Sequence, residues 1–284
     1  MRAQALYHSG VLLALSAASL ALLCPVLLYD TWSAGYFIMV FLVTYSVYGL
    51  DRLAGIEEDR ASHPERVRFL ERWRWPFTAS VALAFLGAAG LAALSGWVTL
   101  LLPLAPAAVV LYSGSLSERF FRLRGPDLKR YFLVKDAAIA SGWAFLLPLS
   151  AFYLDRPLGA GALLFGAPLF VKLFVMASIY DFKDIDSDRR AGVRTLPVVL
   201  GERQSRRLLQ ALNAGASAAI LALVAAGLVS TLAVIFVPAA VYTAFLIHLS
   251  RREAPAWVFF VVADLEQFFW LAYAGIGGWV AAAL

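Results

Sequence analysis

Three aspartates follow one another at regular spacing at the end of a long apolar stretch. Asp181, Asp184 and Asp188 are spaced i, i+3, i+7, and on a helix that spacing places them along one face. Carboxylates on one face repel each other unless a cation neutralises them, and Mg²⁺ commonly binds one or two carboxylates together with substrate phosphates. The spacing therefore favours a divalent cation that bridges to a diphosphate, with a solvated acidic loop as the alternative interpretation.

An earlier acidic run begins at Asp51, directly after another apolar stretch. In chain order it is the first of the two acidic runs, and the run from Asp181 to Asp188 is the second. Asp51 and Glu58 are seven residues apart and share a helical face, so a cation can be bound there as well. Salt bridges with the neighbouring arginines Arg52, Arg60 and Arg66 are the alternative. Two such faces on the same side of a membrane would clamp a single diphosphate between them.

The rest of the chain is unusually apolar. Hydrophobic residues make up 62% of the 284 residues and charged residues 15%, whereas a soluble domain has about 45–50% apolar and about 25% charged residues. This composition excludes a soluble enzyme, a disordered chain and a secreted disulfide scaffold, and the single Cys24 excludes an internal disulfide. The chain is predicted to be a polytopic membrane protein.

Nine apolar stretches are long enough to cross a membrane, and they must be helices because lipid leaves no partner for unpaired backbone groups. The fold class predicted is therefore all-α, with nine transmembrane helices. The stretches are Gly10–Leu28, Trp32–Leu50, Pro76–Gly96, Trp97–Ser113, Ala137–Leu154, Gly159–Tyr180, Leu208–Val229, Leu232–Ser250 and Ala254–Leu284.

The basic residues fix an orientation for these spans. With the N-terminus in the cytoplasm, all of the 24 Lys and Arg residues except Arg156 and Lys172 fall on the cytoplasmic side, as the positive-inside rule requires. Topology explains the net charge of +5, so no nucleic-acid partner is expected. We predict an integral protein of a prokaryotic inner (cytoplasmic) membrane, with both acidic runs on the cytoplasmic side and membrane lipid around it.

The second acidic run continues into a longer pattern. The segment Asp184-x-x-x-Asp188-x-x-x-Gly192-x-x-Thr195-Leu196-Pro197-Val198-x-x-Gly201 resembles the second aspartate-rich signature of the UbiA superfamily of intramembrane prenyltransferases, and Asp181 fits as well. The resemblance extends over residues 1–284 as a single transmembrane domain. It implies a helical bundle around a central cavity that opens to lipid, and an isoprenyl diphosphate bound through Mg²⁺ by the two acidic motifs.

On this resemblance Asp184, Asp188 and Asp51 are the predicted catalytic residues. The usual first motif has an asparagine four residues before its aspartate and another acid four residues after it. With Asp51 as that aspartate, the two positions hold Val47 and Gly55. Glu58 is the candidate replacement for the missing acid, so the predicted metal ligands are Asp51, Glu58, Asp181, Asp184 and Asp188.

Basic side chains near the acidic runs would stabilise the negative charge left on a released diphosphate. The segment from Tyr112 to Asp136 resembles the family's connection between its fourth and fifth helices, and Arg194 lies beside the second motif. The predicted diphosphate-binding residues are Lys135, Tyr112, Arg194, Lys129 and Arg130.

Three charged residues lie inside predicted spans, where charge marks functional sites by default. Lys172 is about two turns before the second acidic run, where it pairs with a carboxylate or extends to water. Asp264 and Glu266, in the last span, face the cavity or pair with a neighbouring helix.

Three functions fit the sequence. The first is a Mg²⁺-dependent transfer of a prenyl group to an aromatic or other lipophilic acceptor, with water kept out by the apolar surroundings. The second is a membrane terpene cyclase of the same superfamily, which needs no external acceptor. The third is a non-enzymatic lipid-binding or transport protein, although the charged motifs lie at span ends rather than at the midplane, where transporter sites are found.

Overall fold

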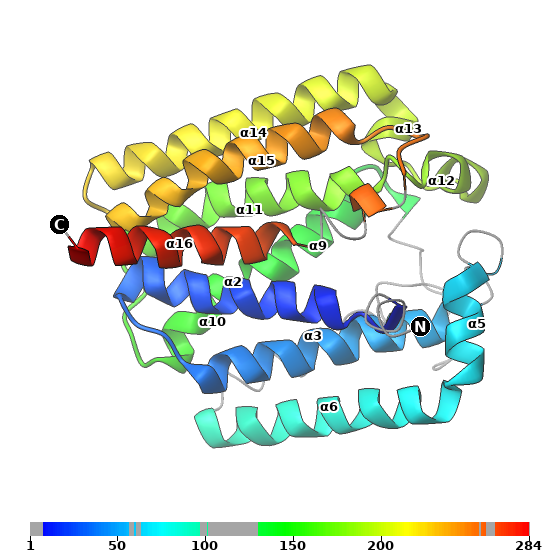
Figure 1. Ribbon diagram of the computed structural model, residues 1–284, viewed down its shortest axis with the longest axis horizontal. Coiled ribbons are helices and arrows are strands. Elements are labelled where there is room, and N and C mark those ends of the chain that lie inside the picture. Colours follow the sequence, from blue (N-terminus) through cyan, green and yellow to red (C-terminus); the bar gives the residue numbers. More distant parts are fainter. Residues whose placement is uncertain are drawn as a thin grey trace. The chain divides into compact units, whose positions relative to one another are not determined.

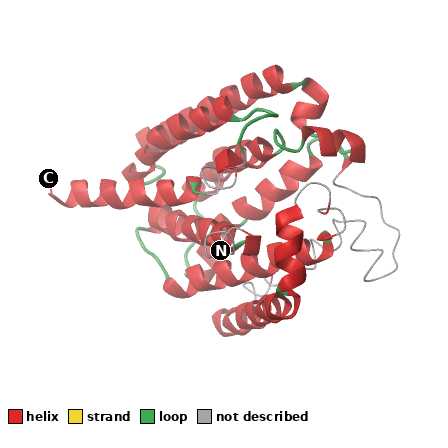
Figure 2. Cartoon of the chain, turned by 45° about the vertical axis from the view of Figure 1, so that its right-hand side comes forward, coloured by secondary structure: helices red, strands yellow, loops and turns green. Residues whose placement is uncertain are grey.

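The computed structural model describes residues 8–56, 60, 64–96, 101, 130–255, 257–259 and 265–283, with 276–283 described by backbone alone. This part of the chain consists of helices and connecting loops and contains no strand (Figure 1, Figure 2). The all-α prediction is confirmed.

Within the described ranges, six helices are long and apolar enough to cross a membrane. Each corresponds to one of the nine predicted spans, and the protein is an integral membrane protein. The six are α2 (Val11–Tyr29), α3 (Ala34–Ala54), α6 (Arg74–Ser95), α11 (Ala160–Tyr180), α14 (Glu202–Ala225) and the segment Thr231–Leu249, formed by η3 (Thr231–Ile235) and α15 (Phe236–Leu249).

The predicted span Ala137–Leu154 is not one continuous helix. It consists of α9 (Val134–Ala144) and α10 (Leu146–Tyr153), separated at Phe145. Pro148 accounts for the interruption, because proline has no N–H to donate to the carbonyl four residues earlier, that of Ala144, and its ring clashes with that group. Phe145 itself keeps helical backbone angles, with φ −63° and ψ −21°, so the apolar segment stays helical through this interruption of its hydrogen bonding.

Two further boundaries differ from the prediction. Helix α14 begins at Glu202, six residues before the predicted Leu208. Its first turns are charged, and the Arg206 guanidinium lies 3.2 Å from the Glu202 carboxylate one turn earlier, so an apolar window misses them. In the last predicted span, α16 occupies Glu266–Ala283. The predicted span Trp97–Ser113 lies outside the described residues apart from Leu101.

The chain divides into two compact units. The first comprises Met1–Ala18 and Ala34–Lys129. Within it α3 packs along α6, and a side chain at Gly49 would lie 2.4 Å from the Val81 side chain. The glycine is therefore what lets these two helices approach closely. The short amphipathic helix α5 (Pro64–Arg72) buries Val67 and Leu70 beside them.

The second unit comprises Ser19–Ser33 and Arg130–Leu284. Its central element is α11, which packs against α9 and α14, while α15 packs against α14 and α16 (Figure 1). Near the start of α11 a side chain at Gly161 would lie 2.0 Å from the carbonyl oxygen of Leu228. Glycine is required there because only a residue without Cβ lets the two backbones touch.

An apolar core lies under the far end of α11, in the same unit. Phe182 and Ile185, from the acidic run itself, are buried in it. The other buried members are Val175, Ile179, Leu196, Leu209, Leu246, Ile247, Val258 and Phe259. Because these apolar side chains are fixed in the core, the acidic residues between them are held in defined directions.

Candidate functional site

Helix α11 ends at Tyr180, and the acidic run begins in the turn that follows. The turn Asp181–Asp184 is closed by backbone hydrogen bonds from Phe182 to Ile179 and from Asp184 to Asp181, and α12 (Ile185–Ala191) starts after it. The predicted face of one continuous helix is therefore absent. From Asp181 to Asp184 each backbone N–H bonds the carbonyl three residues earlier instead of four, and this tighter turn takes the three aspartates off the spacing of a continuous α-helix.

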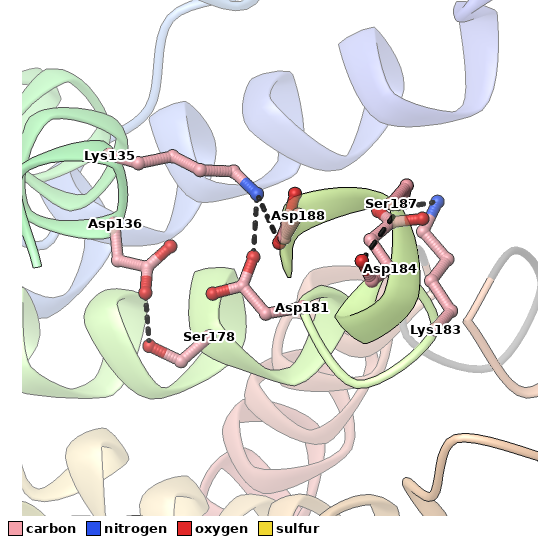
Figure 3. A network of polar contacts seen from close by, with 8 residues as sticks. All are labelled: Lys135, Asp136, Ser178, Asp181, Lys183, Asp184, Ser187 and Asp188. Atoms are coloured by element: carbon pink, nitrogen blue, oxygen red, sulfur yellow. Dashed lines mark hydrogen bonds and ion pairs between the residues drawn. The ribbon is translucent and has the colours of Figure 1, made fainter. Parts of the chain in front are cut away.

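Lys135 lies between two of the three aspartates (Figure 3). Its ammonium nitrogen is 2.6 Å from Oδ1 of Asp181 and 3.9 Å from Oδ2 of Asp188. Asp181 is completely buried, whereas 27% of the Lys135 side chain is exposed. The structure thus brings together Asp181 and Asp188, predicted as metal ligands, and Lys135, predicted as a diphosphate contact.

A third carboxylate joins this group, and the sequence analysis did not single it out. Asp136 is buried, and its Oδ2 accepts a hydrogen bond from the Ser178 hydroxyl at 2.9 Å. Because Ser178 and Asp181 are one turn apart near the end of α11, Lys135 and Asp136 both attach α9 to the same part of that helix (Figure 3). The signal in the sequence was an acid directly after the candidate lysine, at the edge of an apolar stretch.

We call Lys135, Asp136, Asp181 and Asp188 the helix-end cluster. It contains three carboxyl groups and one ammonium group. Three buried oxygens, Oδ1 of Asp136, Oδ2 of Asp181 and Oδ2 of Asp188, have no hydrogen-bond partner in the described part of the chain. Buried polar atoms are rarely left unpaired. The neighbouring carboxyl groups of Asp136 and Asp181 can share a proton between them, and a cation can take the place of that proton.

Burial sets the titration of these groups. It raises the pKa of Asp188 to about 6, against the opposing effect of the Lys135 ammonium. Burial also raises the pKa of Asp181, again opposed by Lys135. For Lys135, burial alone would lower the pKa, but the carboxylates of Asp181 and Asp188 outweigh it and hold that pKa above its ordinary value. Lys135 therefore stays charged.

The remaining acids of the run face other partners. Oδ2 of Asp184 lies 3.8 Å from the ammonium of Lys183, and its backbone carbonyl accepts a hydrogen bond from the Ser187 hydroxyl (Figure 3). Asp186 forms an exposed ion pair with Arg252 at 2.8 Å. The run thus separates into one group with Lys135, one acid with Lys183 and one with Arg252.

Two predicted basic residues meet beside the run. The backbone N–H of Arg194 donates to the carbonyl of Arg130 at 3.3 Å, and both residues are exposed. This contact brings the segment before α9 next to the segment after α12. Of the other predicted diphosphate-binding residues, Tyr112 and Lys129 lie outside the described residues.

The first acidic motif is only partly described. Asp51 is exposed in the last turn of α3, where its carbonyl accepts a hydrogen bond from the Gly55 backbone at 2.8 Å. This N–H-to-carbonyl contact explains one use of Gly55, the position where an acid was expected from the resemblance. Glu58 lies outside the described residues.

The glycines and the proline of the quoted signature lie at the ends and starts of helices. Gly192 ends α12 with a φ of +72°, and Gly201 follows α13 (Leu196–Leu200) with a φ of +76°, a backbone conformation that favours glycine. Pro197 stands in the first turn of α13, where its missing N–H is tolerated. The signature therefore shapes the connection from the acidic run to α14.

A separate polar group is buried beside the middle of α11. The Lys172 ammonium donates to Oδ1 of Asn213 at 2.6 Å and to the Thr243 hydroxyl at 3.3 Å. Thr243 in turn hydrogen-bonds Glu266, and the lysine lies 5.7 Å from the ring centroid of Trp270. We call these five residues the mid-helix cluster. Lys172 and Glu266 are thus linked through Thr243, while Asp264 lies outside the described residues.

The helix-end cluster offers donors of the kind that Mg²⁺ requires. Its donors are carboxylate oxygens, which suit a hard cation, and three of them have no hydrogen-bond partner among the described residues. No group of three or more metal-binding side chains stands ready at coordination distance in the described ranges. The residues fit the ion chemically, and Lys135 occupies the space between two of them.

The whole chain can now be compared with known proteins. No curated protein matches the sequence. Among solved structures, the fold is similar to a UbiA homologue from Aeropyrum pernix K1 in its apo form, with a TM-score of 0.64, 19% identity and coverage of 94% of this chain and 97% of that one. A UbiA homologue from Archaeoglobus fulgidus bound to GPP and Mg²⁺ has a TM-score of 0.63, 11% identity and coverage of 94% and 98%.

A third similar structure is described as digeranylgeranylglyceryl phosphate synthase, with a TM-score of 0.56, 13% identity and coverage of 96% of this chain and 99% of that one. At these identities the structures show a shared fold. The model of the UbiA prenyltransferase family matches residues 11–273, which is nearly the whole sequence. The chain therefore belongs to the UbiA prenyltransferase family.

Proposed function

We propose that the protein is a Mg²⁺-dependent intramembrane prenyltransferase that ionises an isoprenyl diphosphate and transfers the prenyl group to an aromatic or other lipophilic acceptor. Family membership supports the prenyltransferase assignment. The observation that carries the proposal further is the helix-end cluster, which has two buried carboxyl groups, those of Asp136 and Asp181, and the half-buried one of Asp188 for one lysine.

Asp181 and Asp188 are the residues proposed to hold Mg²⁺, with Asp184, Asp51 and Glu58 as the further ligands expected from the two motifs. The Archaeoglobus fulgidus homologue described as bound to DMAPP and Mg²⁺, with a TM-score of 0.59 and 11% identity, supports this choice of ion and substrate class. When bound, the metal would neutralise charge on the leaving diphosphate.

The basic residues are proposed to bind the diphosphate. Lys135 is already next to the carboxylates, and Arg130 and Arg194 adjoin each other through their backbones. Tyr112 and Lys129 complete the proposed set. A charged group fixed near the departing oxygen stabilises the transition state without reorganisation at the moment of reaction.

The apolar helices are proposed to surround the prenyl chain in a central cavity and to exclude water from the carbocation. The acceptor would approach from the surrounding membrane lipid. We further propose that the membrane is a prokaryotic inner (cytoplasmic) membrane, with the N-terminus and the acidic motifs on the cytoplasmic side, because the basic residues are distributed in that sense.

The test is turnover of a panel of prenyl diphosphates by the purified protein with Mg²⁺, with and without membrane extract, followed by mass spectrometry. Asp188→Ala and Asp184→Ala are each expected to abolish turnover. Asp186→Asn is the matched control, because Asp186 belongs to the same run but pairs with the exposed Arg252. Full activity in Asp188→Ala or Asp184→Ala would overturn the assignment.

The same experiment separates the alternatives. Val47 and Gly55 stand where the usual first motif has an asparagine and an acid, and this departure favours a terpene cyclase as the second candidate. A cyclic hydrocarbon or alcohol formed from farnesyl or geranylgeranyl diphosphate alone would identify a cyclase. Diphosphate binding without turnover of any donor would identify a lipid-binding or transport protein.

A further inference from the structure

Lys135 is proposed to bind a diphosphate, yet its ammonium group already pairs with two carboxylates. Its ammonium nitrogen is 2.6 Å from Asp181 and 3.9 Å from Asp188, so it lies where an ion shared by the two carboxylates would lie (Figure 3). Oδ2 of Asp181 has no hydrogen-bond partner in the described part of the chain, and Oδ2 of Asp188 has the lysine at ion-pair distance without a hydrogen bond. The lysine thus satisfies the carboxylates only in part.

The lysine is held in this place from its own helix. It is the second residue of α9, and the next residue, Asp136, is fixed to α11 by the 2.9 Å hydrogen bond from Ser178. The residue before the helix, Leu133, has a φ of +65°, a conformation that costs energy for a residue with a branched side chain and is kept only where the surroundings enforce it. The start of α9 is therefore fixed beside α11, and any movement of the ammonium group must come from the lysine side chain itself.

We propose that Lys135 is an internal counter-ion that occupies the helix-end cluster when no divalent cation is bound, so that the metal binds well only together with a diphosphate. A metal arriving alone would meet the lysine's positive charge between its two ligands. A diphosphate supplies the negative charge to which the ammonium can turn. This inference rests on the proposed function, because it concerns the order in which the same site is filled.

The order of filling has a consequence for the chemistry. A cation held by the carboxylates without a substrate would attract other phosphates, whereas the lysine keeps the cluster partly neutral until the correct anion arrives. The exchange forms and breaks no covalent bond. It replaces one ion pair, Lys135 with Asp181, by two others: metal with carboxylates, and lysine with diphosphate.

The test measures binding of Mn²⁺, a spectroscopic substitute for Mg²⁺, by electron paramagnetic resonance in detergent without any prenyl substrate. Lys135→Met is expected to bind Mn²⁺ alone about tenfold or more tightly than the wild type, because a positive charge has been removed from between the ligands. Arg252→Gln is the matched control. It removes a positive charge from beside Asp186, which is exposed and lies outside the helix-end cluster, at 2.8 Å, and is expected to change the affinity by less than about threefold.

Mn²⁺ binding to the wild type with and without pyrophosphate provides a test that does not depend on whether the variant folds. Inorganic pyrophosphate is expected to tighten Mn²⁺ binding to the wild type at least about tenfold, and to give a smaller gain in Lys135→Met. Equal Mn²⁺ affinity in the wild type with and without pyrophosphate would overturn the inference. So would unchanged or weaker Mn²⁺ binding in a folded Lys135→Met variant.

Failure of the proposed function would look different. A protein that turns over no prenyl diphosphate would contradict the prenyltransferase assignment while leaving the Mn²⁺ and pyrophosphate measurements free to support the exchange. A protein that turns over prenyl diphosphate but binds Mn²⁺ equally with and without pyrophosphate would contradict only the inference about Lys135.

Discussion

Helix α11 carries two lysine-centred clusters that differ in their balance of charge. The helix-end cluster has three carboxyl groups for the single ammonium of Lys135, and three of its buried oxygens have no hydrogen-bond partner among the described residues. The mid-helix cluster has one carboxyl group, that of Glu266, for the single ammonium of Lys172. Both are buried, and both connect helices of the same unit.

The difference indicates different roles. The charges of Lys172 and Glu266, linked by hydrogen bonds to Asn213 and Thr243, balance without any ligand, and the unpartnered atoms of this cluster among the described residues are Oε2 of Glu266 and Nε1 of Trp270. A buried group with surplus negative charge is stable only if something else supplies positive charge or a proton. The mid-helix cluster is therefore interpreted as a connection between α11, α14, α15 and α16, and the helix-end cluster as a binding site.

Among substitutions that keep the size of the side chain, the largest effect is expected from Asp181→Asn, which removes a carboxylate from the helix-end cluster. Turnover of a prenyl diphosphate should fall by about 10²- to 10³-fold, since a charged contact to the reacting group is lost. The measurement is the initial rate at saturating Mg²⁺. Asp186→Asn, with its exposed partner Arg252, should change the rate by less than about threefold, and equal losses in both variants would contradict the division of the acidic run.

The next largest effect concerns stability. Lys172→Met leaves Glu266 buried without its counter-charge and should lower the free energy of unfolding by about 3–5 kcal/mol. The double variant Lys172→Met/Glu266→Gln should recover most of that loss, because no buried charge remains. Reversible unfolding in mixed detergent micelles measures both values.

The activity of the same double variant tests whether the mid-helix cluster has any role in catalysis. If the mid-helix cluster only connects helices, the folded double variant should still turn over prenyl diphosphate at a rate within about tenfold of the wild type. A folded double variant without turnover would mean that Lys172 or Glu266 takes part in binding, and the contrast between the two clusters would then be wrong.

A smaller effect is expected from Ser178→Ala, which removes the hydrogen bond that fixes Asp136 beside α11. Interhelical hydrogen bonds in membrane proteins contribute about 0.6 kcal/mol on average, so the free energy of unfolding should fall by about 0.5–1.5 kcal/mol. Ser150→Ala is a suitable control, because that hydroxyl bonds only within its own segment, to Leu147 at 2.7 Å. An equal loss in both variants would argue against Asp136 as a member of the cluster.

The smallest effect is expected at the exposed pair of Arg252 and Asp186. Arg252→Gln removes a 2.8 Å ion pair whose side chains are about half exposed, at 53% and 46%. Exposed ion pairs contribute about 0–1 kcal/mol, so thermal unfolding should hardly change. If Arg252→Gln lowered the free energy of unfolding as much as Lys172→Met does, the exposed and the buried ion pairs would contribute equally to stability in this protein.

Much of this contrast was visible in the sequence. The acidic run, its position after an apolar stretch and Lys135 as its basic partner followed from residue types and spacing. The break at Asp181 did not, because the i, i+3, i+7 argument assumed an unbroken helix. Phe182 and Ile185 are buried in the core, but residues three apart share one face of a continuous helix, so these two apolar residues do not predict the break.

The partners of Lys172 were beyond the sequence for a different reason. Asn213, Thr243 and Glu266 come from three other helices, 41, 71 and 94 residues along the chain, and only tertiary packing determines which of many polar residues face one lysine. The prediction that Lys172 pairs with a carboxylate or extends to water named the right kind of partner, and the structure supplies the threonine between them.

The direction in which α11 runs adds to the charge at the helix-end cluster. The helix ends at Tyr180, immediately before Asp181. Aligned peptide dipoles give the C-terminal end of a helix a partial negative charge of about half a unit, and this end of α11 is the one that meets the carboxylates. At Asp181 the peptide groups of this 21-residue helix therefore reinforce the demand for a cation, whereas Asp136 and Asp188 lie in the first turns of α9 and α12, where the dipole stabilises a carboxylate.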